Sequence, residues 1–411
     1  MKMQSKYWMV LIAACGMAAS SLGVCFGTAG LFYSPVANDL GVGRGAVALT
    51  STILSLVNSF GGMLVPKILK PKTMKPVIFA ATLLMAGSTA LFSLCPSLAL
   101  IYILSAFRGF GMGLGNFVLV TMLINNWFRK AHGTFTSIAM TFSAVPGLFL
   151  SPVFTKVIQA SGWRTGYLAV ALSIVLFNLP ALLLPISLRP QDSGMKAYGQ
   201  EEYEQLLKEN PGHLVTGRPI SFSFISAEFF LAAAYTGMVC IAAQMTQHFP
   251  TLAESKGFSS DVGALLLSVS MAGSVVCKLI YGTVADRIGS PKTIMTVAGL
   301  AGIACALLIV SSAVLPMQAG AFMYNFTSAN SSIGIALIGS DLFGPQNYSK
   351  VYPVLNFVGS IIGAFSGTVI GLLYDATQSY NIVLTGIGIM QVLCIVCIFT
   401  VYRKINAREA E

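Results

Sequence analysis

The chain alternates between long apolar runs and short polar connections. Backbone groups in lipid must be hydrogen-bonded within their own segment, so each apolar run that is long enough to cross a bilayer is predicted to be an α-helix. A crossing of about 30 Å needs roughly 20 residues at 1.5 Å per residue. Twelve runs qualify, and they cover residues 7–34, 46–66, 75–95, 98–124, 134–158, 166–188, 222–247, 262–284, 292–314, 317–340, 350–374 and 382–402.

One long polar connection divides these runs into two sets of six. It contains Glu201, Glu202, Glu204, Lys208 and Glu209, which is the composition of a cytoplasmic loop with room for one short helix. We therefore expect an N-terminal six-helix bundle over 1–188, a central loop over 189–219 and a C-terminal six-helix bundle over 220–411.

Composition agrees with a bilayer protein. Of the 411 residues, 55% are hydrophobic and 9% are charged, whereas soluble domains carry about 25% charged residues. The Lys and Arg residues behind the net charge of +10 lie between the apolar runs and not along one basic face. We therefore expect no nucleic-acid partner.

The distribution of Lys and Arg predicts the orientation. With the N-terminus inside, the inner segments hold 18 of the 24 basic residues and the outer segments hold 4. This bias predicts a multi-pass protein of the cell membrane with both termini in the cytoplasm.

The two halves contain a repeat at an offset of 220 residues. The sequence Pro-Lys-Thr-Met at 71–74 matches Pro-Lys-Thr-Ile at 291–294, and the same offset maps Gly62 onto Gly282. The Asp286-Arg287 pair has Pro66 and Lys67 as its counterparts, so the halves differ in charge. Two matching halves are typical of transporters that rock about a central site.

Two motifs in this frame resemble the major facilitator superfamily. The connection after the eighth run reads Gly282-Thr-Val-Ala-Asp286-Arg287-Ile-Gly289, and the fourth run contains Arg108-Gly-Phe-Gly-Met-Gly-Leu-Gly. The resemblance implies two pseudo-symmetric six-helix bundles and a secondary transporter. It also implies a cytoplasmic gate at Gly282, Asp286, Arg287 and Gly289, in which the Asp286 carboxylate and Arg287 can pair.

Other stretches resemble the monocarboxylate-transporter and oxalate:formate antiporter branch of that superfamily. They are Ser34-Pro-Val-Ala-Asn-Asp39-Leu-Gly-Val, Asn126-Trp127-Phe128, Gly162-Trp163-Arg164 and Cys277-Lys278-Leu-Ile-Tyr-Gly282. The branch implies an organic-anion solute, with Lys278 as the anion-binding residue. The second basic residue of the oxalate pattern is replaced by Val-Leu-Asn at 354–356, which favours a monocarboxylate over oxalate.

Charged groups inside spans are costly and usually functional. Lys278 and Arg108 are the two basic residues that lie well inside the runs and not at their ends, and the repeat pairs Lys278 with Asn58. Both basic residues have an alternative interpretation. Lys278 could extend its side chain toward the membrane surface, and Arg108 could bond to carbonyls of neighbouring helices. The predicted substrate-binding set comprises Lys278, Arg108, Asn58, Asn116, Phe117, Tyr281, Tyr235, Gln244, Ser328 and Asn356, and most of these could equally be helix-packing residues.

Several functional alternatives stay open. A coupled proton would need a titrating group, for which the candidates are Glu228, His248 and Lys278, while anion exchange or facilitated diffusion would not. A carrier for a neutral or cationic compound, including drug efflux, is the main alternative solute class. The sequence lacks the motifs of a membrane enzyme, so we expect no catalytic residues, no cofactor and no metal. We also expect a monomer.

Overall fold

The computed structural model describes residues 5–115, 117–128, 132–200 and 226–410. The chain forms two compact units, Met1–Pro211 and Gly212–Glu411. The predicted domain limits at 188 and 220 and the central loop between them stay predictions, since residues 201–225 lie outside the described part.

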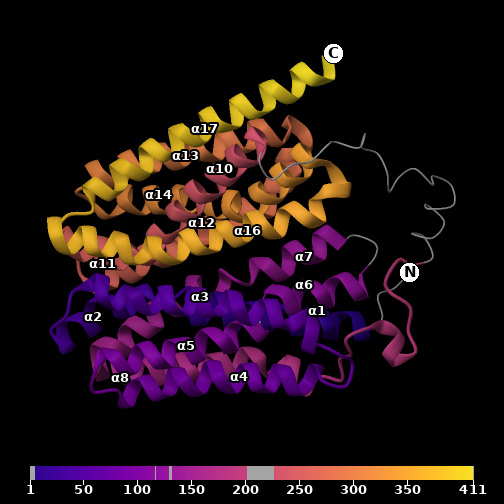
Figure 1. The fold of residues 1–411 in the computed structure, drawn as a ribbon. Coiled ribbons are helices and arrows are strands. Elements are labelled where there is room, and N and C mark those ends of the chain that lie inside the picture. Colours follow the sequence, from indigo (N-terminus) through magenta and orange to yellow (C-terminus); the bar gives the residue numbers. More distant parts are fainter. Residues whose placement is uncertain (1–4, 116, 129–131, 201–225, 411) are drawn as a thin grey trace. The chain divides into compact units, whose positions relative to one another are not determined.

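The first unit is a bundle of helices that lie side by side (Figure 1). α3 packs on α5, α5 on α4 and α4 on α8, while α1 packs on α8. Its helices are α1 (Ser5–Ala18), the π-helix η1 (Ala19–Phe26), α2 (Gly30–Leu40), α3 (Arg44–Ile68), α4 (Met74–Leu91), the 3₁₀ turn η2 (Phe92–Leu94), α5 (Leu98–Gly115), α6 (Phe117–Trp127), α7 (His132–Thr141), α8 (Val145–Leu183) and the 3₁₀ turn η3 (Pro190–Ser193).

The second unit is also a helical bundle, in which α13 packs on α17 and α10 on α16 (Figure 1). Its helices are α10 (Ala227–Gln244), the 3₁₀ turn η5 (Met245–His248), α11 (Phe249–Ser255), α12 (Ser260–Ile288), α13 (Ser290–Val310), α14 (Val314–Tyr324), α15 (Thr327–Ala329), the π-helix η6 (Asn330–Gly334), α16 (Ile335–Thr377) and α17 (Asn381–Ala410). The predicted all-α membrane class is confirmed, because the described residues contain one isolated bridge, between Phe128 and Tyr198, and no strand.

Among the described residues, ten helical stretches are long and apolar enough to cross a membrane. The difference from twelve has two physical sources. The stretch Ile138–Leu183 contains two predicted spans, and Gly162, with φ 80° and ψ 166°, turns the chain between them. The predicted run 317–340 is divided among α14, α15, η6 and the start of α16, so no single helix of the required length covers it.

The connection predicted between residues 340 and 350 is itself helical. α16 runs from Ile335 to Thr377 without interruption, so it joins the end of the tenth predicted run to the eleventh. Helical turns satisfy the backbone hydrogen bonds of such a connection locally, and this explains why it need not be an open loop.

The alternating glycines of α5 allow close packing on two neighbours. A Cβ at Gly113 would lie 2.8 Å from the Cα of Gly61 on α3, and one at Gly111 would lie 2.6 Å from the Cβ of Leu84 on α4. No larger residue fits at these two crossings without moving a helix backbone or its neighbour's side chain.

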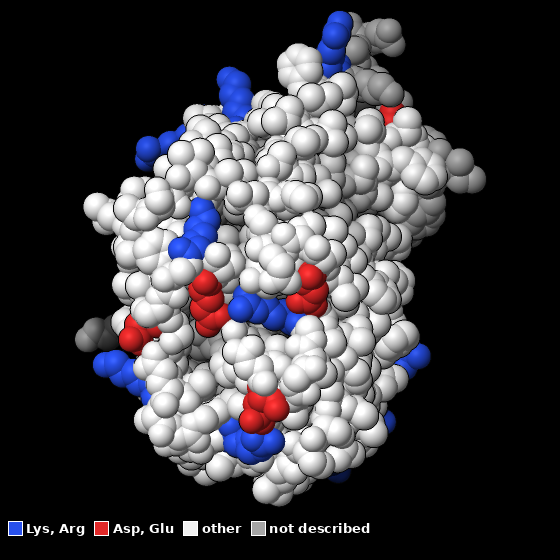
Figure 2. All heavy atoms as spheres, turned by 90° about the vertical axis from the view of Figure 1, so that its left-hand side faces the viewer, with Lys and Arg blue, Asp and Glu red and all other residues white. Residues whose placement is uncertain are grey.

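Large apolar side chains lie on the outside of the helices. Phe79 of α4, Leu172 of α8 and Phe399 of α17 are each about 60% exposed, at 60%, 61% and 58%. Water would penalise such surfaces, whereas lipid tails solvate them, so this distribution suits a bilayer. Figure 2 shows charged side chains scattered singly or beside the opposite charge among uncharged ones at one end of the molecule.

Candidate functional site

The two basic residues inside spans differ in their surroundings. Lys278 lies half-buried on α12, and no described residue gives it a hydrogen bond or an ion pair. Arg108 is buried on α5, where its Nη2 donates to the carbonyl oxygen of Cys25 at 2.5 Å and its Nε to the Cys25 sulfur at 3.0 Å. Its guanidinium carbon also lies 5.5 Å from the centre of the Phe92 ring. Arg108 thus holds the irregular helix η1, which is the packing role considered for it from the sequence.

Two predicted cavity tyrosines meet inside the second unit. Tyr281 of α12 donates its hydroxyl to Asn330 Oδ1 at 2.6 Å, and Tyr235 of α10 donates to the Asn330 carbonyl at 3.4 Å. The amide of Asn330 donates in turn to the carbonyl of Ile294 on α13 at 3.2 Å. Both tyrosines are buried, and the three hydrogen bonds of Asn330 join the π-helix η6 to α10, α12 and α13. Irregular turns of this kind are frequent at functional sites.

Asn330 is the residue of this cluster that the sequence interpretation missed. A fully buried asparagine in an apolar run needs hydrogen-bond partners, and that requirement is a usable signal. It could not be separated from other polar positions of the same run, because Ser331 and Ser332 follow it directly.

The other predicted wall residues of the second unit do not gather at one point. Ser328 of α15 shares a hydrogen bond of 2.5 Å with Ser274 of α12. Gln244 ends α10 and faces α16, where a Cβ at Gly363 would lie 3.5 Å from its amide nitrogen. Asn356 of α16 is exposed. Ser328 and Gln244 therefore lie where helices of this unit cross.

Fewer of the first-unit candidates are described. Asn58 is half-buried on α3, and its backbone oxygen lies against Gly113 of α5. Asn116 and the side chain of Phe117 lie outside the described part. Their proposed contact with a solute stays a prediction.

The motif predicted as a connection is mostly helical: Gly282, Asp286 and Arg287 lie in the last turns of α12, and only Gly289 lies between α12 and α13. Gly289 adopts φ 89° and ends α12, so the helix stops where the motif predicted a turn. Arg287 and Gly282 are exposed, and no described atom would lie within 4 Å of a Cβ at Gly282. Packing within the described structure therefore does not explain the glycine at 282. The side chain of Asp286 is not among those described, so the Asp286-Arg287 latch stays a prediction.

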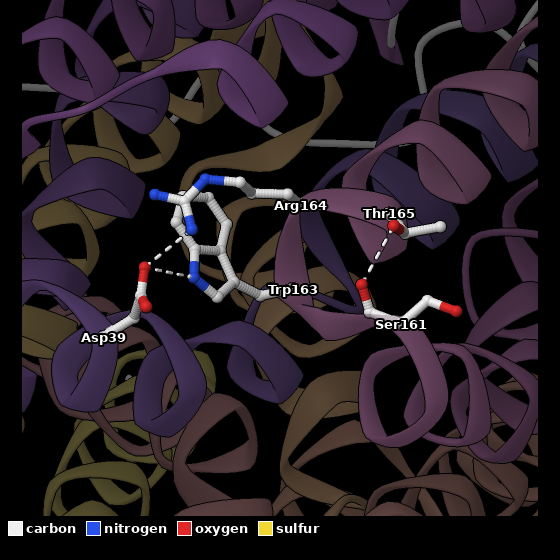
Figure 3. A network of polar contacts seen from close by, with 5 residues as sticks. All are labelled: Asp39, Ser161, Trp163, Arg164 and Thr165. Carbon is white, nitrogen blue, oxygen red and sulfur yellow. Dashed lines mark hydrogen bonds and ion pairs between the residues drawn. The ribbon is translucent and has the colours of Figure 1, made fainter.

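Two motifs quoted for the branch resemblance are in direct contact (Figure 3). Asp39 of α2 accepts hydrogen bonds from Trp163 Nε1 at 3.0 Å and from Arg164 Nη1 at 2.7 Å. The Arg164 guanidinium carbon lies 4.3 Å from the centre of the Trp163 ring. We call Asp39, Trp163 and Arg164 the clasp. It joins the end of the first span to the hairpin at Gly162.

The third motif fixes the opposite end of the first unit. Trp127 donates from Nε1 to the Ser187 carbonyl at 2.9 Å, and Asn126 donates to the Leu188 carbonyl at 3.0 Å. The backbone nitrogen of Tyr198 donates to the Trp127 carbonyl at 2.8 Å. The described start of the central segment therefore packs on the bundle.

Sequence comparison assigns this architecture to a family. A model of the Major Facilitator Superfamily matches residues 9–368, and matches again over 249–411. The chain belongs to the Major Facilitator Superfamily. It is accordingly a membrane transporter of small-molecule solutes and not an enzyme, as the sequence motifs predicted.

Named relatives in this superfamily have different solutes. The chain is 24% identical over 358 residues to an oxalate:formate antiporter of Oxalobacter formigenes, covering 84% of this chain and 79% of that protein. It is 23% identical over 399 residues to a 2-nitroimidazole transporter of Escherichia coli, covering 95% of each. Among solved structures, the nucleoside transporter NupG superposes with a TM-score of 0.70 at 12% identity, over 95% of this chain and all of that one, which supports the major facilitator fold.

Proposed function

We propose that the chain is a secondary active transporter that carries a small organic anion, a monocarboxylate, across the cell membrane by alternating access. The observation that supports an anion is Lys278, a half-buried cation in a span to which no described residue offers a hydrogen bond or ion pair. A charge at such a depth usually pairs with another group or marks a substrate path.

The number of available cations favours a single negative charge on the solute. Arg108 is committed to the Cys25 carbonyl, which leaves Lys278 as the half-buried cation well inside a span that can take a carboxylate, among the described residues. The likeness to an oxalate:formate antiporter supports the anion class. A coupled proton or an exchanged anion would drive the transport, and we propose a monomer with both termini in the cytoplasm.

A second candidate is a carrier for a small neutral compound. The relative named as a 2-nitroimidazole transporter covers 95% of each chain, which is a longer match than that of the oxalate:formate antiporter. Lys278 would then extend toward the membrane surface and bind no solute.

Counterflow in proteoliposomes separates the two candidates. The panel contains formate, lactate, oxalate and 2-nitroimidazole, with wild type, Lys278→Gln and Lys278→Arg. We expect monocarboxylate counterflow in the wild type and a loss of about 30-fold in Lys278→Gln, since removing one partner of a desolvated ion pair costs roughly 2 kcal/mol or more. Lys278→Arg should retain part of the activity.

Lys156→Gln, at an exposed lysine of α8, is the control for losing one positive charge. Monocarboxylate counterflow that survives in Lys278→Gln would exclude the anion-binding role. Counterflow of 2-nitroimidazole alone, unaffected by the substitution, would favour the neutral solute.

A further inference from the structure

One buried amide of the second unit has no hydrogen-bond partner among the described residues. Gln391 lies on α17 and is 1% exposed, and neither its amide nitrogen nor its amide oxygen is bonded there. The residue faces α13, because a Cβ at Gly302 would lie 3.8 Å from the Gln391 Cβ. An unpaired amide in an apolar interior is costly, and buried polar side chains in native proteins nearly always bond to protein or to ordered water.

A second unpartnered polar group belongs to α15. Thr327 is 1% exposed, and its hydroxyl has no hydrogen-bond partner in the described part of the chain. A threonine inside a helix can bond to its own backbone, as Thr236 of α10 does by donating to the Ala232 carbonyl at 2.8 Å. The Thr327 hydroxyl makes no such bond, so it also needs a partner from outside its helix.

Both residues lie in the layer between two apolar clusters of the second unit. Each cluster has members on α10, on α13, on α17 and on the helices next to Thr327. One cluster includes Val239, Ala298, Ala329 and Cys394, and the other includes Ala242, Ala304, Tyr324 and Ile387. Gln391 lies between the α17 members of the two clusters, and Thr327 lies between the members that flank it in sequence. The two unpartnered groups therefore belong to the same layer.

The helices around this layer share their neighbours. α17 packs on both α10 and α13 (Figure 1), and α15 packs on the same two helices. A small ligand held between these helices can therefore be reached from α17 and from α15. The adjacent segment is irregular, since α14 ends at Tyr324 and the π-helix η6 begins at Asn330. Ordered water is one of the means by which membrane proteins satisfy polar groups beside interrupted helices.

The chemistry of the two groups selects a neutral ligand that both donates and accepts. An amide has N–H donors and an accepting oxygen, and a hydroxyl can do either. In the described parts of α10, α13 and α17, charged residues are confined to the first three positions of a helix or to residues from 403 onward. An ion in the layer would find no counter-charge on these helices. Water meets both conditions, and buried waters typically bond polar groups that have no other partner.

We propose that this layer is an internal hydration site, in which ordered water binds the Gln391 amide and bridges it to the Thr327 hydroxyl. The water gives each buried group the hydrogen bond that the surrounding apolar side chains cannot supply. The site lies within the second unit and uses none of the residues proposed to bind the solute. Its existence is therefore independent of the solute that the protein carries.

Water contact at Gln391 can be measured in the wild-type protein. Solid-state NMR in lipid bilayers, with glutamine side chains labelled with ¹⁵N, follows magnetisation transfer from water protons to each amide. The signal that is missing in Gln391→Met identifies Gln391, and the signal of the exposed Gln378, missing in Gln378→Gly, is the reference for a hydrated amide. We expect transfer to Gln391 at a rate comparable with that to Gln378. A Gln391 amide that receives no magnetisation from water would refute the site.

A double-mutant cycle tests the bridge to Thr327. The readout is the equilibrium constant of unfolding in mixed detergent micelles for the wild type, Gln391→Met, Thr327→Val and the double variant. Both substitutions keep the approximate size of the side chain and remove its hydrogen bonds. We expect the effect of the double variant to fall short of the product of the two single effects by at least about threefold, because both substitutions disrupt the same bridge.

Thr293→Val is the matched control for this cycle. Thr293 is a buried threonine of the same unit and lies nine residues, or roughly 14 Å along α13, before the Gly302 contact. Its combination with Gln391→Met should be multiplicative, since residues this far apart rarely couple. The same coupling in both cycles, or coupling in neither, would refute the bridge. A fall of about tenfold or more in the unfolding constant of Gln391→Met alone would show that the wild-type amide is unpaired, and would overturn the hydration site.

Discussion

Arg108 and Lys278 look alike in the sequence, since each is a lone cation in an apolar run, yet their contacts differ. The Cys25 carbonyl that binds Arg108 belongs to a π-helix 83 residues earlier in the chain. Hydropathy and residue spacing carry no signal for a π-helix or for its carbonyl directions. The sequence could therefore place both cations in the membrane and could not assign their roles.

Substitution of Arg108 by lysine should affect stability before it affects solute binding. Lysine keeps the charge but cannot reach both the sulfur and the carbonyl of Cys25 with one planar group. We expect a loss of about 1–3 kcal/mol in the free energy of unfolding, as for a buried hydrogen bond to a charged group. Thermal unfolding in detergent measures it.

Arg189→Lys, at an exposed position, is the matched control and should leave the melting temperature unchanged. If Arg108→Lys unfolds like the wild type while the KM for solute rises, Arg108 contacts the solute and its packing role is wrong.

At the scale of elements, one lysine in each unit caps the C-terminus of another helix. Lys75 at the start of α4 donates to the carbonyls of Ala181, Leu182 and Leu184 at 2.5 to 2.9 Å, where α8 ends. Lys256 does the same for the end of α13, and burial lowers the pKa of Lys256 while the three carbonyls favour its charged form. The last carbonyls of a helix lack partners within it, so a cation there is doubly favourable.

Removing this cap should destabilise the first unit. In Lys75→Met the carbonyls at the end of α8 lose their common donor, and we expect the free energy of unfolding to fall by about 1–3 kcal/mol. Lys72→Met removes an exposed lysine three residues earlier and is expected to change it by less than about 0.5 kcal/mol. Equal melting temperatures for the two variants would show that the cap contributes nothing.

Helix positions were predictable because lipid imposes a minimum length and internal hydrogen bonding on every span. The positions of the irregular helices were not predictable, since the serines, glycines and apolar residues of η1 and η6 also occur in the regular helices around them. The hairpin at Gly162 was expected as a short loop and is made by one residue in a conformation that favours glycine. The π-helices and the turn at Gly162 depend on local backbone conformation, which the spacing of apolar residues does not indicate.

At the scale of the whole molecule, the charge bias predicts the sidedness of the protein. Ser312, after α13, should face outward, and Lys70, after α3, should face the cytoplasm. A membrane-impermeant maleimide should label Ser312→Cys in intact cells and Lys70→Cys only after permeabilisation. The eight native cysteines are buried or half-buried, so the parent protein provides a low background. The reverse labelling pattern would invert the topology.

Family and fold could be predicted from motifs and hydropathy, but the solute could not. Relatives of nearly equal identity, 24% and 23%, are named for oxalate and formate in one case and for 2-nitroimidazole in the other. A few side chains select the solute, whereas hundreds of residues build the bundles. Sequence similarity at this level therefore reports the scaffold.

The clasp also sets an order of events during synthesis. Asp39 and Arg164 are 125 residues apart, so at 5–20 residues per second the carboxylate leaves the ribosome roughly 6–25 s before its guanidinium partner. The first span is therefore synthesised well before the hairpin that will contact its end. The clasp can form only after the chain has turned at Gly162, so its hydrogen bonds join the end of the first span to the bundle late in synthesis.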